Sequence, residues 1–234
     1  ITLIPKKDKC TTKLDNLRPI TLLSIYYKLI SGALATRLKD ALKGTIHSNQ
    51  KAYLEGRYLG EISRSLIDVM TDLEQTNSNA AILLVDFSKA FDSISHDFIY
   101  NSLELLNFGP NFVKHIKYLL SNRSSKVNNS GHIGKSFQLE RGVPQGDPIS
   151  AYLFVAALEI LLHRLRTDPG IARVRLSNGG TLLELAYADD LTIILPRHAE
   201  SVSRIMQILD EFRAISGLAI SIKKTTCTNI GIDK

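Results

Sequence analysis

A short apolar run at residues 80–87 (AAILLVDF) is the feature that most limits how this chain can fold. Its richness in Ile, Leu and Val indicates a strand buried inside a sheet. Helix-type segments lie on both sides of this run, and further strand-type runs follow without regular alternation of strand and helix. The pattern therefore favours an α+β fold, in which an antiparallel sheet is backed by helices.

The spacing of apolar residues and the turn formers between them predict the other elements. Helices are expected at residues 22–42, 60–74, 95–106, 111–120, 148–166 and 200–215, with Pro148 as the first residue of its helix. Strands are expected at 172–176, 182–187 and 191–195, and a final strand pair at 219–222 and 226–230. Residues 124–129 and 135–140 flank a glycine-containing turn, which predicts a hairpin, and residues 6–16 are polar and loop-like.

Composition sets the broad class of the protein. With 234 residues, 44% of them hydrophobic, the chain can bury one large core or two closely packed subdomains. The net charge of +6 is compatible with a polyanionic partner but does not require one. Cys10 and Cys227 have no metal-type spacing, which favours a reducing compartment, the nucleus or the cytoplasm. The longest apolar run, residues 152–162, is too short to span a bilayer, and the start at Ile1 suggests a piece of a longer chain.

Three aspartates stand out as candidates for chemistry. Asp86 ends the buried strand, and Asp189 and Asp190 lie between two strand-type segments. Carboxylates gathered on neighbouring strands repel one another unless a cation is present, and they suit Mg²⁺, which prefers oxygen ligands. Each aspartate taken alone can equally cap a helix or shape a turn, so the pattern by itself leaves both interpretations open.

Several motifs resemble those of reverse transcriptases, above all the enzymes of non-LTR (LINE-type) retrotransposons. The resemblance rests on LLVDFSKAFDSISH, ERGVPQGDPIS, AYADDLTII and SGLAISIKKT, preceded by LIPKKDK, LRPITLLS and NQKAYLEGR. These motifs stand in the order of the family and cover nearly the whole chain. Ala151 stands where the family often has Pro, and Pro144 where many members have a basic or polar residue; neither position carries a catalytic group.

The resemblance implies a right-hand polymerase fold. Residues 1–79 correspond to a partial fingers region, and residues 80–234 to the palm, with a segment around 93–140 that returns to the fingers. The helical thumb of the family is absent from this chain and would lie beyond Lys234.

The resemblance also implies the catalytic groups. Asp86, Asp189 and the backbone carbonyl of Phe87 match metal ligands, and Asp190 matches their companion carboxylate. The expected cofactor is a pair of Mg²⁺ ions, with Mn²⁺ as a possible replacement. Lys224 matches the general acid that protonates the leaving pyrophosphate, although a solvated lysine on a strand is the ordinary alternative.

A second group of residues is implied in substrate binding. Phe91 matches the bulky residue that excludes a ribose 2′-hydroxyl, although it can also be a core aromatic. Arg18, Gln145 and Gly146 match positions near the incoming nucleotide. Arg57 and Arg141 are candidates for contacting the nucleic-acid backbone.

The implied function is RNA-directed DNA synthesis during retrotransposition. The expected partners are an RNA template, a DNA primer and dNTPs, with no membrane. Three alternatives stay open: an RNA-dependent RNA polymerase, against which Phe91 argues; a group II intron or retron enzyme; and an inactive remnant that only binds nucleic acid.

Overall fold

The computed structural model describes residues 1–7, 10, 12–196 and 199–230. Its helices are α1 (Ile25–Leu42), α2 (Gly60–Gln75), α3 (Ala90–Ser93), α4 (His96–Leu105), α5 (Pro110–Leu120), α6 (Ser150–Thr167) and α7 (Ala199–Ser216), with a short 3₁₀ turn at Leu14–Asn16. Its strands are β1 (Thr2–Pro5), β2 (Leu17–Ile20), β3 (Ala80–Val85), β4 (Ser124–Ser125), β5 (Asn128–Asn129), β6 (His132–Ile133), β7 (Phe137–Gln138), β8 (Val174–Arg175), β9 (Thr181–Leu182), β10 (Glu184–Tyr187), β11 (Asp190–Pro196) and β12 (Thr226–Ile230).

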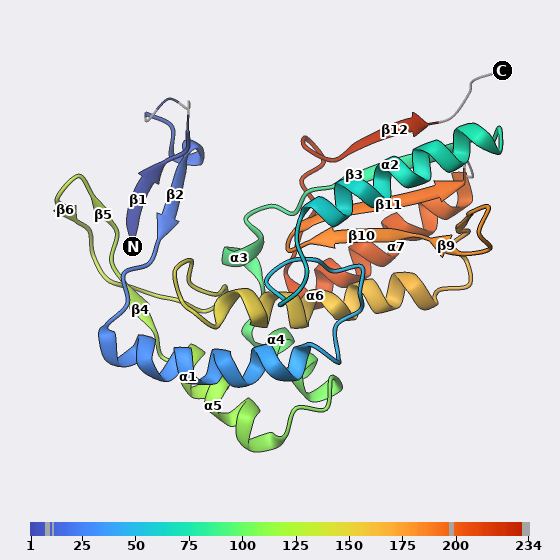
Figure 1. The fold of residues 1–234 in the computed structure, drawn as a ribbon. Coiled ribbons are helices and arrows are strands. Elements are labelled where there is room, and N and C mark those ends of the chain that lie inside the picture. Colours follow the sequence, from blue (N-terminus) through green and yellow to red (C-terminus); the bar gives the residue numbers. More distant parts are fainter. Residues whose placement is uncertain (8–9, 11, 197–198, 231–234) are drawn as a thin grey trace.

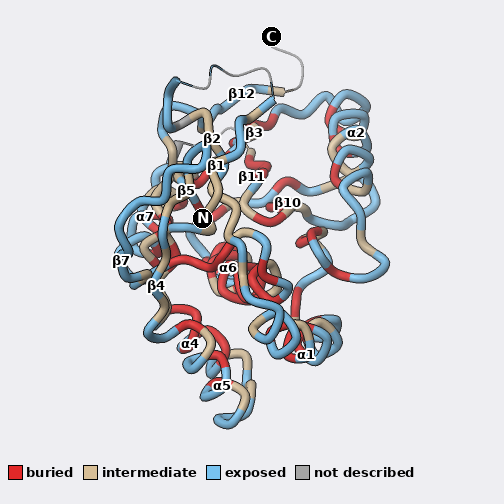
Figure 2. Tube along the Cα trace, turned by 90° about the vertical axis from the view of Figure 1, so that its left-hand side faces the viewer, coloured by how far each residue is buried: buried red, intermediate tan, exposed pale blue. Residues whose placement is uncertain are grey.

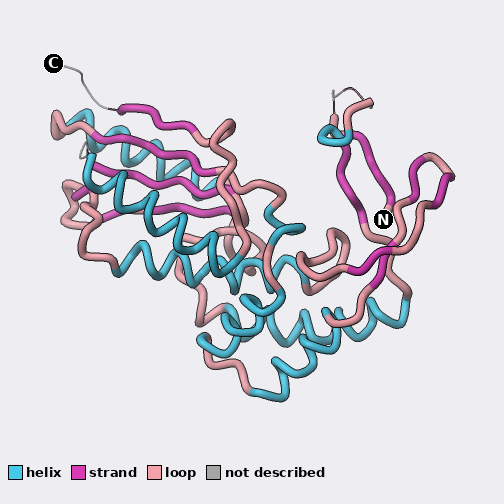
Figure 3. The backbone as a smooth tube through the Cα atoms, turned by 180° about the vertical axis from the view of Figure 1, so that it is seen from behind, coloured by secondary structure: helices cyan, strands magenta, loops and turns pink. Residues whose placement is uncertain are grey.

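The main sheet has four antiparallel strands in the order β10-β11-β3-β12. The apolar run at 80–87 supplies the central strand β3, which confirms the predicted buried strand. Its partner β11 places Leu191 opposite Val85, so the last residue of β3 lies beside the beginning of β11. Figure 3 shows these strands side by side at one end of the molecule. The α+β class predicted from the pattern is therefore confirmed.

Successive side chains of a strand point to opposite faces of the sheet. Both faces of the main sheet carry apolar side chains, and both pack against helices. Leu83 and Val85 of β3 and Ile193 of β11 belong to the large core that contains α6 and α7. On the other face, Ile194 packs with Val69 and its neighbours from α2. Helix α6 is apolar on most of its surface and is the most deeply buried helix in Figure 2.

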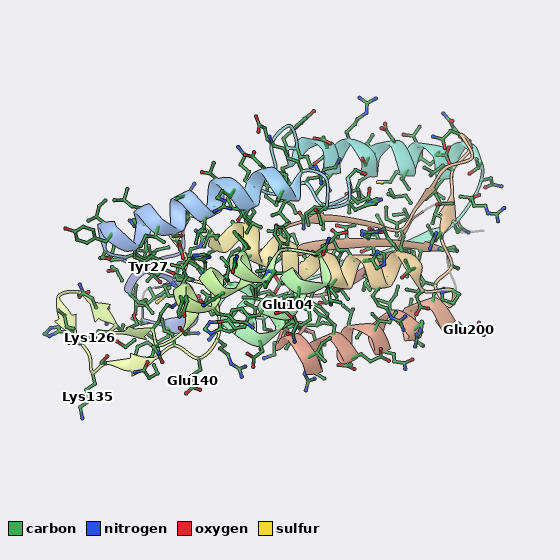
Figure 4. The ribbon with its side chains drawn as sticks, turned by 90° about the horizontal axis from the view of Figure 1, so that it is seen from below. Tyr27, Glu104, Lys126, Lys135, Glu140 and Glu200 are labelled. Carbon is green, nitrogen blue, oxygen red and sulfur yellow. The ribbon has the colours of Figure 1, made fainter. Side chains whose placement is uncertain are left out.

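A second, smaller β-region lies apart from the main sheet (Figure 1). It has the strand order β2-β1-β5-β6. Strand β2 leads into α1, and β5 and β6 lie in the segment between α5 and α6. The predicted hairpin at 124–140 is confirmed as two nested antiparallel pairs, β4 with β7 and β5 with β6. Lys126 and Lys135 project from this hairpin (Figure 4).

The predicted final strand pair is wrong. Residues 226–230 form β12, but this strand pairs with β3, and residues 219–222 contribute only an isolated bridge between Ile220 and Phe87. The reason lies in β3. Strand β11 pairs with one edge of β3, and the other edge is free to pair with β12. A local hairpin would leave that row of backbone groups without partners.

Several boundaries also differ from the prediction. Helix α1 begins at Ile25 because the side chain of Ser24 caps it, accepting a hydrogen bond from the Tyr27 amide at 3.3 Å. Helix α6 begins at Ser150 and not at Pro148. The predicted strands at 172–176 and 182–187 are shorter or divided, giving β8, β9 and β10. Residues 8, 9 and 11 of the predicted loop at 6–16 lie outside the described residues.

In the part of the chain that the structure describes, no helix combines the length and apolarity needed to cross a membrane. Cys10 and Cys227 are both free and exposed.

Candidate active site

The main sheet brings the three predicted aspartates to one edge. Asp86 follows β3 directly, Asp190 begins β11, and Asp189 lies in the two-residue turn between β10 and β11. Burial raises the pKa of Asp189, and the charges of Asp190 and Asp86 raise it further. The three aspartates therefore concentrate negative charge, and the nearby positive charge of Lys224 offsets only part of it.

Lys224 provides part of that compensation. Its Nζ lies 3.0 Å from Oδ1 of Asp86, and the two side chains are 65% and 31% exposed. The loop that carries Lys224 is fixed to the same strand end, because the Ser221 amide donates to the Asp86 carbonyl at 2.7 Å. The structure thus brings together the predicted general acid and a predicted metal ligand.

The four predicted nucleotide-binding residues line one hollow beside Asp189. This hollow has a volume of about 570 Å³, and its walls include Arg18, Phe91, Gln145, Gly146 and Asp189. Asp86, Asp190 and Lys224 line a neighbouring hollow of about 270 Å³. Residues distant in the sequence therefore line two hollows, one at Asp189 and the other at Asp190.

Phe91 is held at the wall of the larger hollow by an aromatic stack. Its ring lies 4.7 Å from that of Phe154 in α6, with an angle of 18° between the planes. Its backbone carbonyl accepts a hydrogen bond from the Val143 amide at 2.7 Å. The ring is therefore both a partly buried core residue and a lining residue of the hollow, and its exclusion of a ribose 2′-hydroxyl stays a prediction.

Glycines allow the 141–147 loop to approach its neighbours closely. Gly142 has a φ of +79°, and a Cβ there would come within 2.7 Å of the Asp92 carbonyl oxygen. Gly146 has a φ of +107°, and the amide of Thr21 donates to the carbonyl of Gln145 at 2.9 Å. Side chains at these two positions would force the loop or its neighbours to shift.

The donor set at the sheet edge fits a divalent cation of the Mg²⁺ type. Carboxylates and a backbone carbonyl are hard oxygen ligands. Burial raises the pKa of Asp189 most, and the neighbouring carboxylates add repulsion that a cation would relieve. Among the described residues, no three or more His, Cys, Asp or Glu side chains gather closely enough to hold a metal by themselves. Substrate phosphates and water would therefore have to complete the coordination.

Comparison with known proteins decides the family. The sequence pattern of the family "Reverse transcriptase (RNA-dependent DNA polymerase)" matches residues 4–231. The chain belongs to the reverse transcriptase family. Within it, this reverse transcriptase domain is related to the polymerases of non-LTR retrotransposons.

Three relatives illustrate that relationship. The chain is 31% identical over 237 residues to a Pol polyprotein of the retrotransposable element R2 from Popillia japonica, covering 98% of this chain and 32% of the relative. It is 29% identical over 226 residues to the 149 kDa protein of transposon TX1 from Xenopus laevis, covering 97% and 17%. It is 24% identical over 238 residues to the polymerase of the mobile element jockey from Drosophila melanogaster, covering 98% and 25%. The chain thus spans less than a third of the length of these relatives.

Solved structures show the same fold at low sequence identity. Telomerase from Candida tropicalis, truncated from its C-terminal domain, superposes with a TM-score of 0.61 at 13% identity, covering 87% of this chain and 41% of that one. The RNA-dependent RNA polymerase of a human picobirnavirus gives 0.58 at 13% identity, covering 97% and 40%. The reverse transcriptase domain therefore has a fold similar to that of both polymerases.

The two predicted nucleic-acid contacts lie outside these hollows. Nη1 of Arg57 donates to the carbonyls of His47 and Gln50 at 2.6 and 2.8 Å, and Nη2 to that of Ile46 at 3.0 Å. These bonds give Arg57 a structural task in its own loop. Arg141 is exposed and pairs through its backbone with Ser95. Contact of either arginine with nucleic acid stays a prediction.

Tyr53 and Asp147 are among the residues lining the larger hollow that the sequence did not single out. Tyr53 lines it together with Asp189 and lies in the NQKAYLEGR motif. Asp147 is buried and accepts hydrogen bonds from Ser31 and, at 3.0 Å, from the hydroxyl of Tyr27, both in α1. The sequence signal for Asp147 is a carboxyl group inside a glycine- and proline-rich loop. Its burial requires hydrogen-bond donors, and α1 supplies them.

Proposed function

We propose that the chain is an RNA-directed DNA polymerase that extends a primer 3′-hydroxyl with dNTPs on an RNA template during retrotransposition. The observation that carries this proposal is the meeting of Asp86, Asp189 and Asp190 at one sheet edge, next to the hollow lined by Phe91. Membership of the reverse transcriptase family and kinship with non-LTR elements support the same activity.

The proposed architecture is a right-hand polymerase. Residues 80–234 form the palm, residues 1–79 form partial fingers, and a segment around 93–140 returns to the fingers. The separate β-region with β1, β2, β5 and β6 (Figure 1) supports this division, because it combines the first residues with the returning segment.

Each side chain has a proposed task at the site. Arg18 would hold the triphosphate, since a guanidinium binds phosphate through paired hydrogen bonds. Gln145 and the backbone at Gly146 would position the incoming nucleotide. Phe91 would exclude a ribose 2′-hydroxyl by steric clash, and the ammonium of Lys224 would protonate the leaving pyrophosphate.

Asp86, Asp189, Asp190 and the carbonyl of Phe87 would hold the metal cofactor. Two Mg²⁺ ions, or Mn²⁺ in their place, would supply activation of the primer hydroxyl and neutralisation of charge on the triphosphate. The protein's own part is to keep these oxygen ligands at fixed positions, which the paired ends of β3 and β11 favour.

An inactive remnant that only binds nucleic acid is the second candidate. The chain spans less than a third of the length of these relatives, so the activity of the whole proteins does not by itself establish the activity of this chain. Against this candidate, every acidic residue expected at the site is present.

Primer extension on an RNA template tests the proposal. The chain is compared with Asp189→Ala, with dNTPs and with Mg²⁺ present or absent. Extension that requires both Mg²⁺ and Asp189 is expected, whereas equal extension by the variant would refute the assignment. Duplex binding without any extension, also from a chain lengthened beyond Lys234, would favour the remnant.

A further inference from the structure

The 46–57 loop runs along the outer edge of β10, beside the turn that carries Asp189. The amide of Lys51 donates to the carbonyl of Ala186 at 2.8 Å, and the amide of Ala186 donates to the carbonyl of Asn49 at 2.9 Å. These two bonds form an isolated parallel bridge centred on Gln50. A segment far away in the sequence is thereby fixed against the main sheet.

The side chain of Gln50 is fully buried and reaches into the turn itself. Its Oε1 accepts hydrogen bonds from the amides of Ala188 at 3.1 Å and Ala52 at 2.9 Å. Its Nε2 lies 3.5 Å from the carbonyl of Ala188, to which it donates. A side-chain amide carries both a donor and an acceptor, so Gln50 can serve the amide and the carbonyl of Ala188 together.

Ala188 needs such support. It is the first residue of the two-residue turn between β10 and β11, and its φ is +53°. This left-handed conformation favours glycine and is unfavourable for a residue with a side chain. Ala188 is also buried and lies outside the strand ladder. Its backbone amide and carbonyl therefore require hydrogen-bond partners within the protein. Gln50 supplies a partner to both of them.

The loop that carries Gln50 is itself fixed from two sides. On one side, Arg57 donates to the carbonyls of Ile46, His47 and Gln50. On the other, the side chain of Asn49 donates to Glu184 at 3.4 Å. The loop that carries Gln50 is therefore held in place by its own hydrogen bonds.

A buried cluster extends the second anchor into α6. Arg166 donates to Glu184 at 2.7 Å and also pairs with Glu159. Both carboxyl groups are buried within this cluster, which links α6, β10 and the loop. The anchor therefore belongs to the core of the molecule.

We infer that Gln50 is a positioning residue, which holds the Ala188 turn and thereby fixes the Asp189 carboxylate at the site. Asp189 follows Ala188 directly, so a change in the backbone of Ala188 would move that carboxylate relative to Asp86. The catalytic consequence rests on the proposed function, whereas the effect on the turn does not.

Hydrogen exchange in the protein without substrates tests the effect on the turn. In the unmodified chain, the Ala188 amide is expected to exchange as slowly as the amides of β11, although it lies outside the strand ladder. In Gln50→Met, which keeps the length of the side chain but loses its hydrogen bonds, this amide should exchange at least about tenfold faster. The exchange of β3 amides should stay unchanged.

Activity provides the second measurement. Gln50→Met should lower kcat by at least about tenfold while KM for dNTP stays within about twofold. The hydrogen bonds of the Gln50 side chain go to Ala188 and Ala52, and not to the predicted nucleotide-binding residues. The matched control is Gln75→Met at the exposed end of α2, which should behave like the unmodified chain. Fast exchange of Ala188 in the unmodified chain, or slow exchange in Gln50→Met, would overturn the inference. Altered exchange in a chain that never extends a primer would support the positioning role and contradict the proposed function alone.

Discussion

The side-chain ammonium of Lys224 lies 3.0 and 3.2 Å from the two carboxylate oxygens of Asp86. The neighbouring Lys223 is also exposed, but the ion pair with Asp86 is formed by Lys224. Replacing each lysine in turn can therefore distinguish a specific role of Lys224 in the reaction from a general effect of positive charge in this loop.

Lys224→Ala should therefore slow the chemical step of nucleotide addition. A general acid contributes about 100-fold or more to such a step, so a loss of about 100-fold in the single-turnover rate is expected. Lys223→Ala, which removes the same charge one residue away, should stay within about twofold of the unmodified rate. Equal losses in the two variants would show that only the total charge of the loop matters.

Phe91→Val should relax the preference for dNTPs over rNTPs. The ring lines the nucleotide hollow and is held by its stack on Phe154. Its removal opens space for a 2′-hydroxyl, and the ratio of kcat/KM for dNTP and rNTP should fall by about tenfold or more. The ring pair Phe108–Phe112 offers a control, because Phe108→Val removes a similar contact outside the hollow. A variant that keeps the original preference would remove Phe91 from sugar discrimination.

The ion pair of Asp168 with Arg204 makes stability depend on pH. Hydrogen bonds from Arg204, at 2.7 Å for the shortest, lower the pKa of Asp168 below its ordinary value of 3.8, although burial opposes them. The folded state then binds fewer protons than the unfolded state between the lowered pKa and 3.8. The stabilisation is complete above 3.8 and is lost as the pH falls through the folded pKa.

Asp168→Asn should accordingly melt at a lower temperature than the unmodified chain at neutral pH. The difference between the two melting temperatures should shrink as the pH is lowered below 3.8. Asp210→Asn is the control, since Asp210 forms an exposed pair with Arg213 at 3.7 Å and contributes little. A difference that stays constant over this pH range would mean that the ion pair is not the cause.

The elements with a strong local pattern could be predicted from the sequence. The buried strand β3 and the aspartates at its end follow from a single apolar run that stops at Asp86. The partner of β12 did not follow, because two neighbouring strand-type runs suggest a hairpin while the free edge of β3 is visible only in the sheet.

The residues that gather at the candidate site could be predicted from the sequence, but the contacts that support them could not. The contact between Gln50 and Ala188 joins residues 138 positions apart, and no local pattern contains it. Arg57 is a basic residue near the candidate site, which suggested nucleic acid, whereas its guanidinium donates to carbonyls of its own loop. Supports of this kind depend on tertiary contacts, so they could be found only in the structure.

Tyr27 provides a test of the connection between α1 and the nucleotide hollow. It lies on the inner side of α1 (Figure 4), and its hydroxyl donates to the buried carboxylate of Asp147 at 3.0 Å. Burial, followed by the charge of Asp147, raises the pKa of Tyr27 to about 12, so the hydroxyl remains a donor at any ordinary pH. Because Asp147 also lines the hollow, this bond links the helix to the 141–147 loop.

Tyr27→Phe should lower the free energy of unfolding by about 1.5–3 kcal/mol, the usual effect of losing a hydrogen bond to a charged group. It should also raise KM for dNTP, because the loop that holds Gln145 and Gly146 loses one of its attachments. Urea unfolding and steady-state kinetics measure the two effects. The adjacent Tyr26 is 77% exposed, so Tyr26→Phe should change neither quantity. A raised KM without any loss of stability would place the effect in direct nucleotide contact, whereas a loss of stability at constant KM would confine Tyr27 to the packing of α1.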